Sequence, residues 1–343
     1  MCVSGRCRVT ESVLRVGLDL DGSLESLGDS MNDLADALAA TGDCDLVRYR
    51  SAGPIGPGER GLPGRRLWGP AWRRGRGRVL DRALDGLDLL HVAGLATPPT
   101  RRIPLVVSVD DLRPLRGEQH THQRVAQLRR ALDAGATLVA SSRVASHEVL
   151  DVLGAARAQV AVVPPAVPVV AETTDGTDLV LNVTGAIERL LGVLDELVDV
   201  GQRLASPLVV LASEDAAHRV RATNAPVLVR ERREARTALG RARCVLHLSD
   251  GARFPSFAIA ALAAGVPTVA RSTSINRELL GGAAILVDDN ARLAEALLDS
   301  ALNEPRRAIL RAAGRDRARD FAPQTAAGAY LDLYRRVVQG WAT

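Results

Sequence analysis

Residues Cys244 to Ala270 read CVLHLSDGARFPSFAIAALAAGVPTVA, and this stretch decides the fold. An apolar run from Val245 to Leu248 leads into a turn at Ser249 to Gly251, and an alanine-rich helix begins near Ser256 before Gly265 ends it. This order predicts a strand, a loop, a helix, a turn and a second strand. In open α/β sheets, ligands bind where a loop at the carboxyl end of a parallel strand leads into a helix N-terminus. The stretch therefore predicts a ligand-binding loop.

The composition predicts a globular protein of two domains. A chain of 343 residues with 47% hydrophobic and 24% charged residues has enough apolar side chains for two cores and is not disordered. Aromatic residues make up only 3%, which argues against the base-stacking surfaces of single-stranded nucleic-acid binders, so no nucleic-acid partner is expected. The net charge of +4 comes from arginine alone, because the sequence contains no lysine. Schiff-base chemistry and a lysine phosphate clamp are therefore excluded.

The cysteines and the N-terminus bear on cofactors and location. Cys2, Cys7, Cys44 and Cys244 show no Cys-x-x-Cys spacing and have no histidine cluster nearby, so no metal, no other cofactor and no disulfide is predicted. Residues 1–13 are polar and lack the apolar centre of a signal peptide, and no apolar run is long enough to cross a membrane. A cytoplasmic protein with reduced thiols is expected.

Strands and helices alternate along the first half of the chain. Strands are predicted over residues 13–20, 46–49, 88–92, 104–109, 137–140 and 160–163. Helices are predicted over residues 29–42, 79–87, 119–134 and 142–153, the last of them capped by Ser141 and Ser142. This rhythm is typical of a doubly wound α/β domain, which we assign to residues 1–165.

The same rhythm restarts after residues 166–178, whose prolines and small polar residues have the composition of a linker. Outside the opening stretch, strands are predicted over residues 179–183, 207–212, 226–229 and 283–287, and helices over residues 190–204, 235–241 and 291–302. A final helical pattern occupies residues 323–343. The fold class is therefore α/β, with two Rossmann-like doubly wound domains, residues 1–165 and 179–322, facing each other across a cleft.

An arginine-rich segment interrupts the first half. Seven arginines lie between Arg60 and Arg78, together with Trp68 and Trp72. Arginine beside tryptophan can bind an anionic lipid surface, where each basic residue contributes about 1 kcal/mol. A solvated surface loop is the alternative. Weak peripheral contact with the inner membrane face through Arg60 to Arg78 is therefore kept open beside a purely cytoplasmic location.

Two adjacent carboxylates, Asp110 and Asp111, follow the strand predicted over residues 104–109. At the carboxyl end of a strand they are candidates for a general base or for a pair that binds hydroxyl groups. The alternative is that they cap the next element or stay solvated.

Seven short segments, taken in order, resemble the GT-B fold glycosyltransferases, specifically the family-four retaining type. They are residues 16–20 (VGLDL), 88–94 (DLLHVAG), 104–112 (PLVVSVDDL), 162–167 (VVPPAV), 261–269 (ALAAGVPTV), 282–288 (GAAILVD) and 330–336 (YLDLYRR). Together they span nearly the whole chain. The resemblance implies a nucleotide-sugar donor in the second domain, an acceptor in the first, transfer without a metal, and a final helix that crosses back onto the first domain.

Two positions at which the family carries glutamates are alanines here. The family's glutamates accept hydrogen bonds from sugar and ribose hydroxyls. With Gly265 and Pro267 as anchors, these positions are Ala252 and Ala260. Neither side chain can accept a hydrogen bond, and each lost partner weakens binding by about 1–3 kcal/mol.

The resemblance also supplies the remaining site candidates. The family's basic pair for the donor diphosphate follows the strand that ends near Gly185, where Arg189 is the basic residue, and the family's histidine after residues 104–109 is Asp110. The catalytic candidates are Asp110 and Arg189. The donor-binding candidates are Gly185, Asp250, Gly251, Arg253 and Ser256, and the acceptor-side candidates are Gly28, Asp29, Ser142 and Arg143. Asp29 replaces the second glycine of the family's first loop, where a carboxylate opposes an anionic ligand.

Two functions follow from this pattern. In the first, the chain is an active transferase in which Asp250 accepts sugar hydroxyls while Arg253 or Arg189 meets phosphate. In the second, it is a non-catalytic member that acts as a protein partner or scaffold, because several motifs have lost their residues while the strands stay well patterned.

Overall fold

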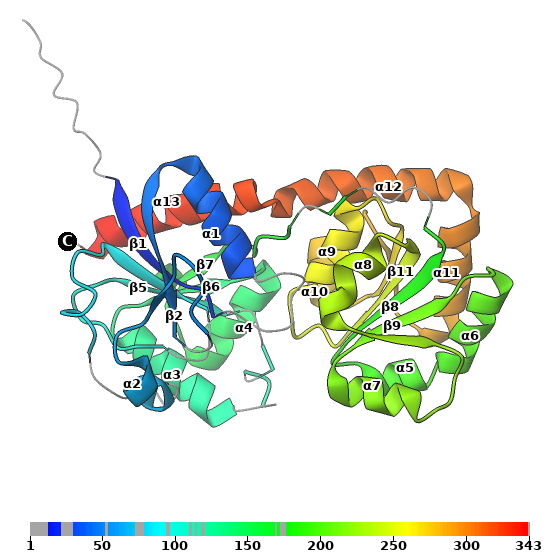
Figure 1. Cartoon of the computed structure of the whole chain (residues 1–343), viewed down its shortest axis with the longest axis horizontal. Coiled ribbons are helices and arrows are strands. Elements are labelled where there is room, and N and C mark those ends of the chain that lie inside the picture. Colours follow the sequence, from blue (N-terminus) through cyan, green and yellow to red (C-terminus); the bar gives the residue numbers. More distant parts are fainter. Residues whose placement is uncertain are drawn as a thin grey trace, which may run out of the picture.

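The computed structural model describes residues 13–21, 30–51, 54–72, 79–93, 97–109, 112–113, 115–117, 121–168, 170–171 and 176–341, apart from the side chains of residues 68–70, 121 and 184. Two sheets with helices packed around them lie next to each other (Figure 1). The expectation of two doubly wound α/β domains is confirmed.

The first domain contains a parallel sheet of seven strands in the order β3-β2-β1-β4-β5-β6-β7. The strands are β1 (Leu14–Asp19), β2 (Cys44–Arg50), β3 (Arg60–Gly61), β4 (Leu89–Val92), β5 (Leu105–Val109), β6 (Thr137–Ala140) and β7 (Val160–Val162). Its helices are α1 (Ser30–Thr41), α2 (Arg65–Trp72), α3 (Thr121–Asp133) and α4 (Arg143–Leu153). Every residue of β4 and β5 is buried, because helices cover both faces of a central parallel strand.

The second domain contains a parallel sheet of six strands in the order β10-β9-β8-β11-β12-β13. The strands are β8 (Asp178–Thr184), β9 (Leu208–Ala212), β10 (Leu228–Glu231), β11 (Ala242–Ser249), β12 (Thr268–Arg271) and β13 (Ile285–Val287). Its helices are α5 (Ile187–Leu191), α6 (Leu194–Arg203), α7 (Glu214–Arg221), α8 (Ala235–Leu239), α9 (Ser256–Ala263), α10 (Ser274–Leu280) and α11 (Leu293–Leu302).

Two long helices complete the chain. In Figure 1, α12 (Glu304–Ala318) lies along the second domain, and α13 (Pro323–Trp341) continues across the first domain. The crossing-back helix that the resemblance implies is therefore present. Between the two helices, the Phe321 carbonyl accepts a 2.9 Å hydrogen bond from the N–H of Val167. The two segments that connect the domains are thus bonded to each other.

Helix α13 is fixed to the first domain by a buried polar network. Nδ1 of His91 lies 2.7 Å from the hydroxyl of Tyr334, and Nε2 lies 2.9 Å from Oγ of Ser108. The Tyr330 ring packs beside that of His91, with 5.2 Å between the ring centroids. Burial lowers the pKa of His91 to about 3, so this imidazole is neutral at physiological pH.

The structure differs from the predicted pattern in a few elements. Residues 79–87 form turns and not the expected helix, because the N–H of Leu80 donates to the carbonyl of Pro99 outside the segment and Gly86 has a φ of 85°. The helix expected over residues 190–204 is two helices, α5 and α6, separated at Gly192. Helices α2, α7, α10 and α12 and the two-residue strand β3 were not predicted.

Helix α2 carries part of the arginine-rich segment. Trp72 is fully buried, and its carbonyl accepts a 2.9 Å hydrogen bond from the side-chain amide of Gln127, so its ring is not free to enter a membrane. Leu67 is 81% exposed on the same helix. Residues 73–78 lie outside the described part of the chain. Among the described helices, none has the length and apolar content that crossing a bilayer requires.

Candidate interdomain site

The strand orders locate one candidate site. In the second domain the order reverses between β8 and β11, and in open α/β sheets the crevice at the carboxyl ends of two such strands is where ligands bind. Thr184, at the end of β8, is paired with Ser249, at the end of β11. The donor candidates Gly185 and Asp250, which follow these two residues, are therefore neighbours at that point.

The Asp250 side chain lies against Gly185. Gly185 has a φ of 70°, in the left-handed region that favours glycine, and a Cβ at this position would overlap Oδ2 of Asp250. Oδ1 of Asp250 accepts a 2.8 Å hydrogen bond from the N–H of Ala252. The turn at residues 250–252 thus places a carboxylate where the two strands end.

Ala252 and Ala260 are both completely buried. Ala260 lies on α9, whose residues from Phe257 to Leu262 are all buried, and Gly314 of α12 approaches Leu262 closely enough that a Cβ there would lie 3.2 Å from it. This close packing explains the alanine-rich sequence of α9. Neither position offers a hydrogen-bond acceptor side chain to a ligand.

One arginine from each domain contributes positive charge near this turn. Arg232 follows β10, and its Nη2 donates a 2.7 Å hydrogen bond to the carbonyl of Val183 on β8. Burial, and then the charge of Arg113 from the first domain, lower the pKa of Arg232. Neither Arg113 nor Arg232 is among the site candidates from the sequence. The arginines at 232 and 233 after a predicted strand were the available signal, but nothing local distinguishes them from the chain's many other arginines.

A second pair of arginines lies at the carboxyl ends of β8 and β12. The pKa of Arg271 is lowered by burial and by the charge of Arg189, the catalytic candidate on α5. Nη1 of Arg271 donates a 3.0 Å hydrogen bond to Oδ1 of Asn290. Arg253 lies in the turn between β11 and α9, and Ser256 is the first residue of α9. The donor-side candidates therefore gather at one edge of the second sheet.

The first domain contacts the turn at residues 250–252 directly. The N–H of Leu112 donates to the carbonyl of Ala252 at 2.9 Å. Nη2 of Arg116 donates to the carbonyl of Gly251 at 2.9 Å, and its Nη1 lies 3.5 Å from that of Asp250. Because Leu112 and Arg116 follow β5, the carboxyl edge of the first sheet faces the carboxyl edge of the second.

The acceptor-side candidates are divided between described and undescribed parts of the chain. Ser142 caps α4, as predicted, and its Oγ accepts a 3.0 Å hydrogen bond from the N–H of Ala145. The N–H groups of Arg143 and Val144 donate to the carboxylate of Glu278, on α10 of the second domain. Gly28, Asp29 and the adjacent carboxylates Asp110 and Asp111 lie outside the described residues.

A buried carboxyl group ends β1 at the strand-order reversal of the first sheet. Oδ1 of Asp19 accepts hydrogen bonds from the N–H of Ser51 at 3.0 Å and of Asp21 at 3.3 Å. Oδ2 has no hydrogen-bond partner among the described residues. Burial is the main cause that raises the pKa of Asp19 to about 7. We had not predicted a site role for Asp19, although an aspartate at the end of an apolar strand was a readable signal.

Nothing in the described part of the chain is arranged as a metal centre, since it contains no group of three or more His, Cys, Asp or Glu residues placed to hold an ion. The described cysteines, Cys44 and Cys244, are free and buried, and burial raises the pKa of Cys244 to about 11. A thiol with such a pKa is protonated and unreactive at neutral pH.

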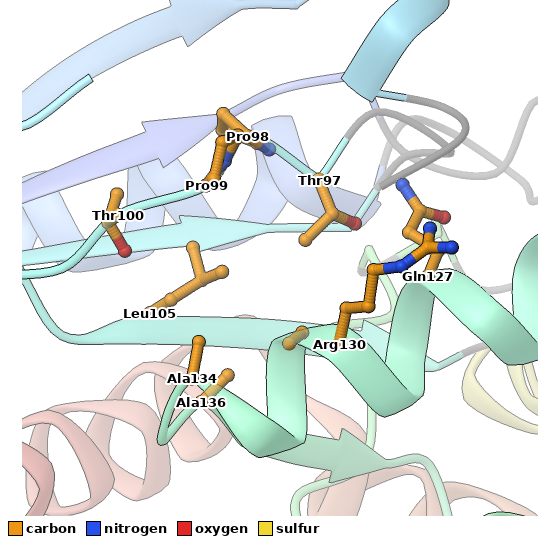
Figure 2. Close-up of a pocket in the computed structure, with 10 residues that line it drawn as sticks. Thr97, Pro98, Pro99, Thr100, Leu105, Gln127, Arg130, Ala134 and Ala136 are labelled. Carbon is orange, nitrogen blue, oxygen red and sulfur yellow. The ribbon is translucent and has the colours of Figure 1, made fainter. Parts of the chain in front are cut away.

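A cavity of about 50 Å³ lies in the first domain between residues 97–100 and α3. Figure 2 shows Thr97, Leu105, Gln127 and Arg130 among its lining residues. Leu105 begins β5 and Ala136 precedes β6, so the cavity lies at the amino ends of these strands. It is therefore on the opposite edge of the sheet from the interdomain site.

No protein-family model and no curated protein matches this chain, but solved structures match it over nearly its whole length. HepE from Anabaena, in complex with UDP-glucose, superposes with a TM-score of 0.69 at 14% identity, covering 94% of this chain and 99% of the other. For sucrose-phosphate synthase from Thermosynechococcus elongatus the TM-score is 0.65 at 16% identity, covering 95% and 100%. For WaaG, a glycosyltransferase involved in lipopolysaccharide biosynthesis, it is 0.63 at 14% identity, covering 93% and 99%. The chain therefore has the GT-B glycosyltransferase-like fold.

Proposed function

We propose that the interdomain site binds a nucleotide-sugar and that the chain is a glycosyltransferase-like protein, with the acceptor on the first domain. The observation that carries the proposal is the position of Arg232 at the switch point of the second sheet, where its guanidinium is fixed by a hydrogen bond to the carbonyl of Val183 and interacts with the charge of Arg113 from the first domain. A site with cations from both domains favours an anionic ligand. The diphosphate of a nucleotide-sugar is such an anion.

Three further features support a diphosphate ligand. Arg189 and Arg271 add a second pair of cations at the same sheet edge. Guanidinium groups bind phosphate with paired hydrogen bonds, and the chain has no lysine for this task. HepE, which has a similar fold, was solved with UDP-glucose and with UDP and glucose. A retaining, metal-independent transfer remains the reaction type that the resemblance implies.

Titration calorimetry with UDP-hexoses and GDP-hexoses tests this proposal. We expect the wild-type protein to bind at least one of them with a Kd below about 1 mM, which corresponds to about −4 kcal/mol. Arg232→Gln should weaken that binding at least tenfold, and added salt should weaken it further. Arg236→Gln, at an exposed position of α8, is the matched control. A folded wild-type sample that binds none of these ligands would refute the proposal.

A non-catalytic partner or scaffold is the second candidate function. It is favoured by the complete burial of Ala252 and Ala260, which leaves no carboxylate at either position, and by the Asp250 carboxylate close to the region proposed for the diphosphate. In this case the protein binds a nucleotide-sugar without consuming it, or binds another transferase. Co-purification from the native host would support a partner role. Sugar transfer by the isolated monomer would exclude it.

We also propose that the protein is cytoplasmic and that its arginine-rich segment makes peripheral contact with the membrane. Arg65, Arg66 and the exposed Leu67 lie on one short helix, α2, and supply both the cationic and the apolar part of such a contact. Sedimentation with vesicles containing anionic lipid tests it. Binding that is absent, or that does not weaken with salt, would argue for a solvated segment.

A further inference from the structure

The cavity at the amino ends of β5 and β6 is separate from the interdomain site. It lies between residues 97–100, which precede β5, and one face of α3, and its volume is about 50 Å³ (Figure 2). Protein interiors contain few voids larger than a water molecule. One water needs a cavity of about 10–15 Å³, so this one has room for about three to five non-hydrogen atoms. It is therefore large enough for the tail of a small organic molecule.

Hydrogen bonds fix both walls of the cavity. On one side, the carbonyl of Pro99 accepts a 3.1 Å bond from the N–H of Leu80. On the other side, Oε1 of Gln127 accepts a 2.9 Å bond from Nη1 of Arg124, and Nε2 of Gln127 donates a 2.9 Å bond to the carbonyl of Trp72. Sites for small molecules are usually formed before the ligand arrives. This cavity has that property, since its walls are held without a ligand.

One part of the lining is apolar and made of small side chains. Ala131 of α3, and Ala134 and Ala136 after it, contribute only methyl groups, and Leu105 and Pro98 complete this part. In Figure 2, Ala134 and Ala136 lie across the cavity from Pro98. Such a surface favours an apolar group, because each CH₂ that it buries strengthens binding about fourfold.

The other part of the lining contains a buried hydroxyl group. Thr97 is only 5% exposed, and its Oγ1 has no hydrogen-bond partner among the described residues. In Figure 2, Thr97 lies on the same side of the cavity as Gln127 and the guanidinium of Arg130. Buried hydroxyl groups nearly always have a partner, because burial without one is unfavourable. A ligand with an acceptor atom at this end supplies the partner.

Arg130 makes an anionic acceptor the best fit. Its side chain lines the cavity, and it also has another interaction within the protein. A guanidinium has five N–H donors, so an existing partner does not exhaust it. A carboxylate has two oxygens and can accept from the hydroxyl of Thr97 and from a guanidinium at once.

We propose that this cavity binds a small carboxylate with a short unbranched apolar tail. The carboxylate lies at Thr97 and Arg130, and the tail lies between Leu105 and the three alanines. Because the cavity is on the opposite edge of the sheet from the interdomain site, this ligand is distinct from a nucleotide-sugar and its acceptor. The proposal does not rest on the proposed function.

NMR titration of the full-length protein with acetate, propionate and butyrate tests the class of ligand. Butyrate should bind with a Kd in the millimolar range, and affinity should rise about fourfold with each added CH₂ group. Butyramide, the uncharged analogue of butyrate, should bind at least tenfold more weakly than butyrate. Equal affinity for the three acids, equal affinity for butyrate and butyramide, or no saturable binding of butyrate would each overturn the proposal.

Variants of the lining test the place of binding. Ala131→Leu should fill the cavity and abolish butyrate binding without lowering the melting temperature, because the added atoms occupy existing space. Thr97→Val, which removes the hydroxyl, and Arg130→Gln should each weaken butyrate binding at least tenfold. Thr97→Ser, which keeps the hydroxyl, and Arg129→Gln, at an exposed neighbouring position of α3, are the matched controls and should retain it.

Wild-type affinity for butyrate in Ala131→Leu would place the ligand elsewhere and overturn the proposal. If Ala131→Leu does not fold, wild-type affinity in both Thr97→Val and Arg130→Gln decides against it in the same way. None of these measurements depends on nucleotide-sugar binding, so failure of one proposal leaves the other standing.

Discussion

The two domains are held together at two places that differ in chemistry. At one, α13 docks on the first domain through neutral, fully buried groups, with His91 between Tyr334 and Ser108. At the other, α4 and the neighbouring Arg116 meet the second domain through charged groups that retain some exposure, such as Arg116 at 30% and Glu278 at 15%. Both arrangements use short hydrogen bonds, so bond length does not separate them.

Burial decides how strongly each place resists separation. A buried polar group that loses its partner inside the protein remains without a partner, which costs about 1–3 kcal/mol. On the α4 side, the bonds between the domains use the partly exposed charged side chains of Arg116 and Glu278, which are solvated again when they separate, and such contacts contribute about 0–1 kcal/mol. The α13 side is therefore expected to act as the fixed pivot, and the α4 side as the part that opens and closes.

The largest effect should come from breaking the pivot at Tyr334. Tyr334→Ala removes a fully buried ring and its hydrogen bond to His91, and it should lower the free energy of unfolding by about 3–5 kcal/mol. Tyr334→Phe keeps the ring and should cost about 1–3 kcal/mol, because Nδ1 of His91 loses its partner. Urea denaturation measures both. A loss below about 1 kcal/mol for Tyr334→Ala would contradict the pivot.

Acid should lower the free energy of unfolding, because His91 in the pivot is held neutral in the folded protein. Its pKa is about 3 in the folded protein and about 6.5 when unfolded, so between these values the unfolded state binds a proton that the folded state does not. The contribution of His91 to the free energy of unfolding is complete above pH 6.5. Below that pH it falls by about 1.4 kcal/mol per pH unit, which gives a loss of about 2 kcal/mol at pH 5. Denaturation of wild type and His91→Gln from pH 7 to pH 5 should show a smaller decrease for the variant. Equal slopes would show that His91 does not titrate on unfolding.

Most of the fold was readable from the sequence because its signals are local. Strand β6 has the predicted bounds, and the Ser142 cap of α4 follows from a serine ahead of an apolar helical pattern. The helix expected over residues 79–87 was wrong because Leu80 finds its hydrogen-bond partner at Pro99, in a distant loop. Helix α10 was missed because seven residues with a central charged pair give little periodicity.

The site was readable only in part. Gly185 and Asp250 both follow predicted strands, and the resemblance places them among the donor-binding candidates; the pairing of these adjacent strands brings the two residues together. The roles of Glu278, Arg116 and Arg113 depend on contacts between the domains, and the sequence contains no local sign of which charged residue meets which. In an arginine-rich chain a single arginine carries almost no positional information. Partners across the interface therefore required the structure.

A smaller loss of stability is expected from breaking the contact between Gly185 and Asp250, which lies on the α4 side. Gly185→Ala places a Cβ where Oδ2 of Asp250 lies, at a φ of 70° that alanine disfavours, and should cost about 1–3 kcal/mol. In an Asp250→Ala background the overlap is gone and about 1 kcal/mol of backbone strain should remain. A double-mutant cycle by urea denaturation measures this coupling. Additive effects would show that the carboxylate does not occupy that space in solution.

The smallest effect on stability should come from Glu278, whose carboxylate joins α10 to the first N–H groups of α4. Glu278→Gln keeps an oxygen that can accept one of the two N–H groups of α4 and loses the attraction to the helix dipole. The expected loss of unfolding free energy is about 1 kcal/mol or less, and it should shrink at high salt because the dipole interaction is screened. The measurement is urea denaturation at low and high salt, beside Tyr334→Ala under the same conditions. A loss for Glu278→Gln as large as that for Tyr334→Ala would mean that α4 also belongs to the pivot, and the domains would then have no weaker side at which to open.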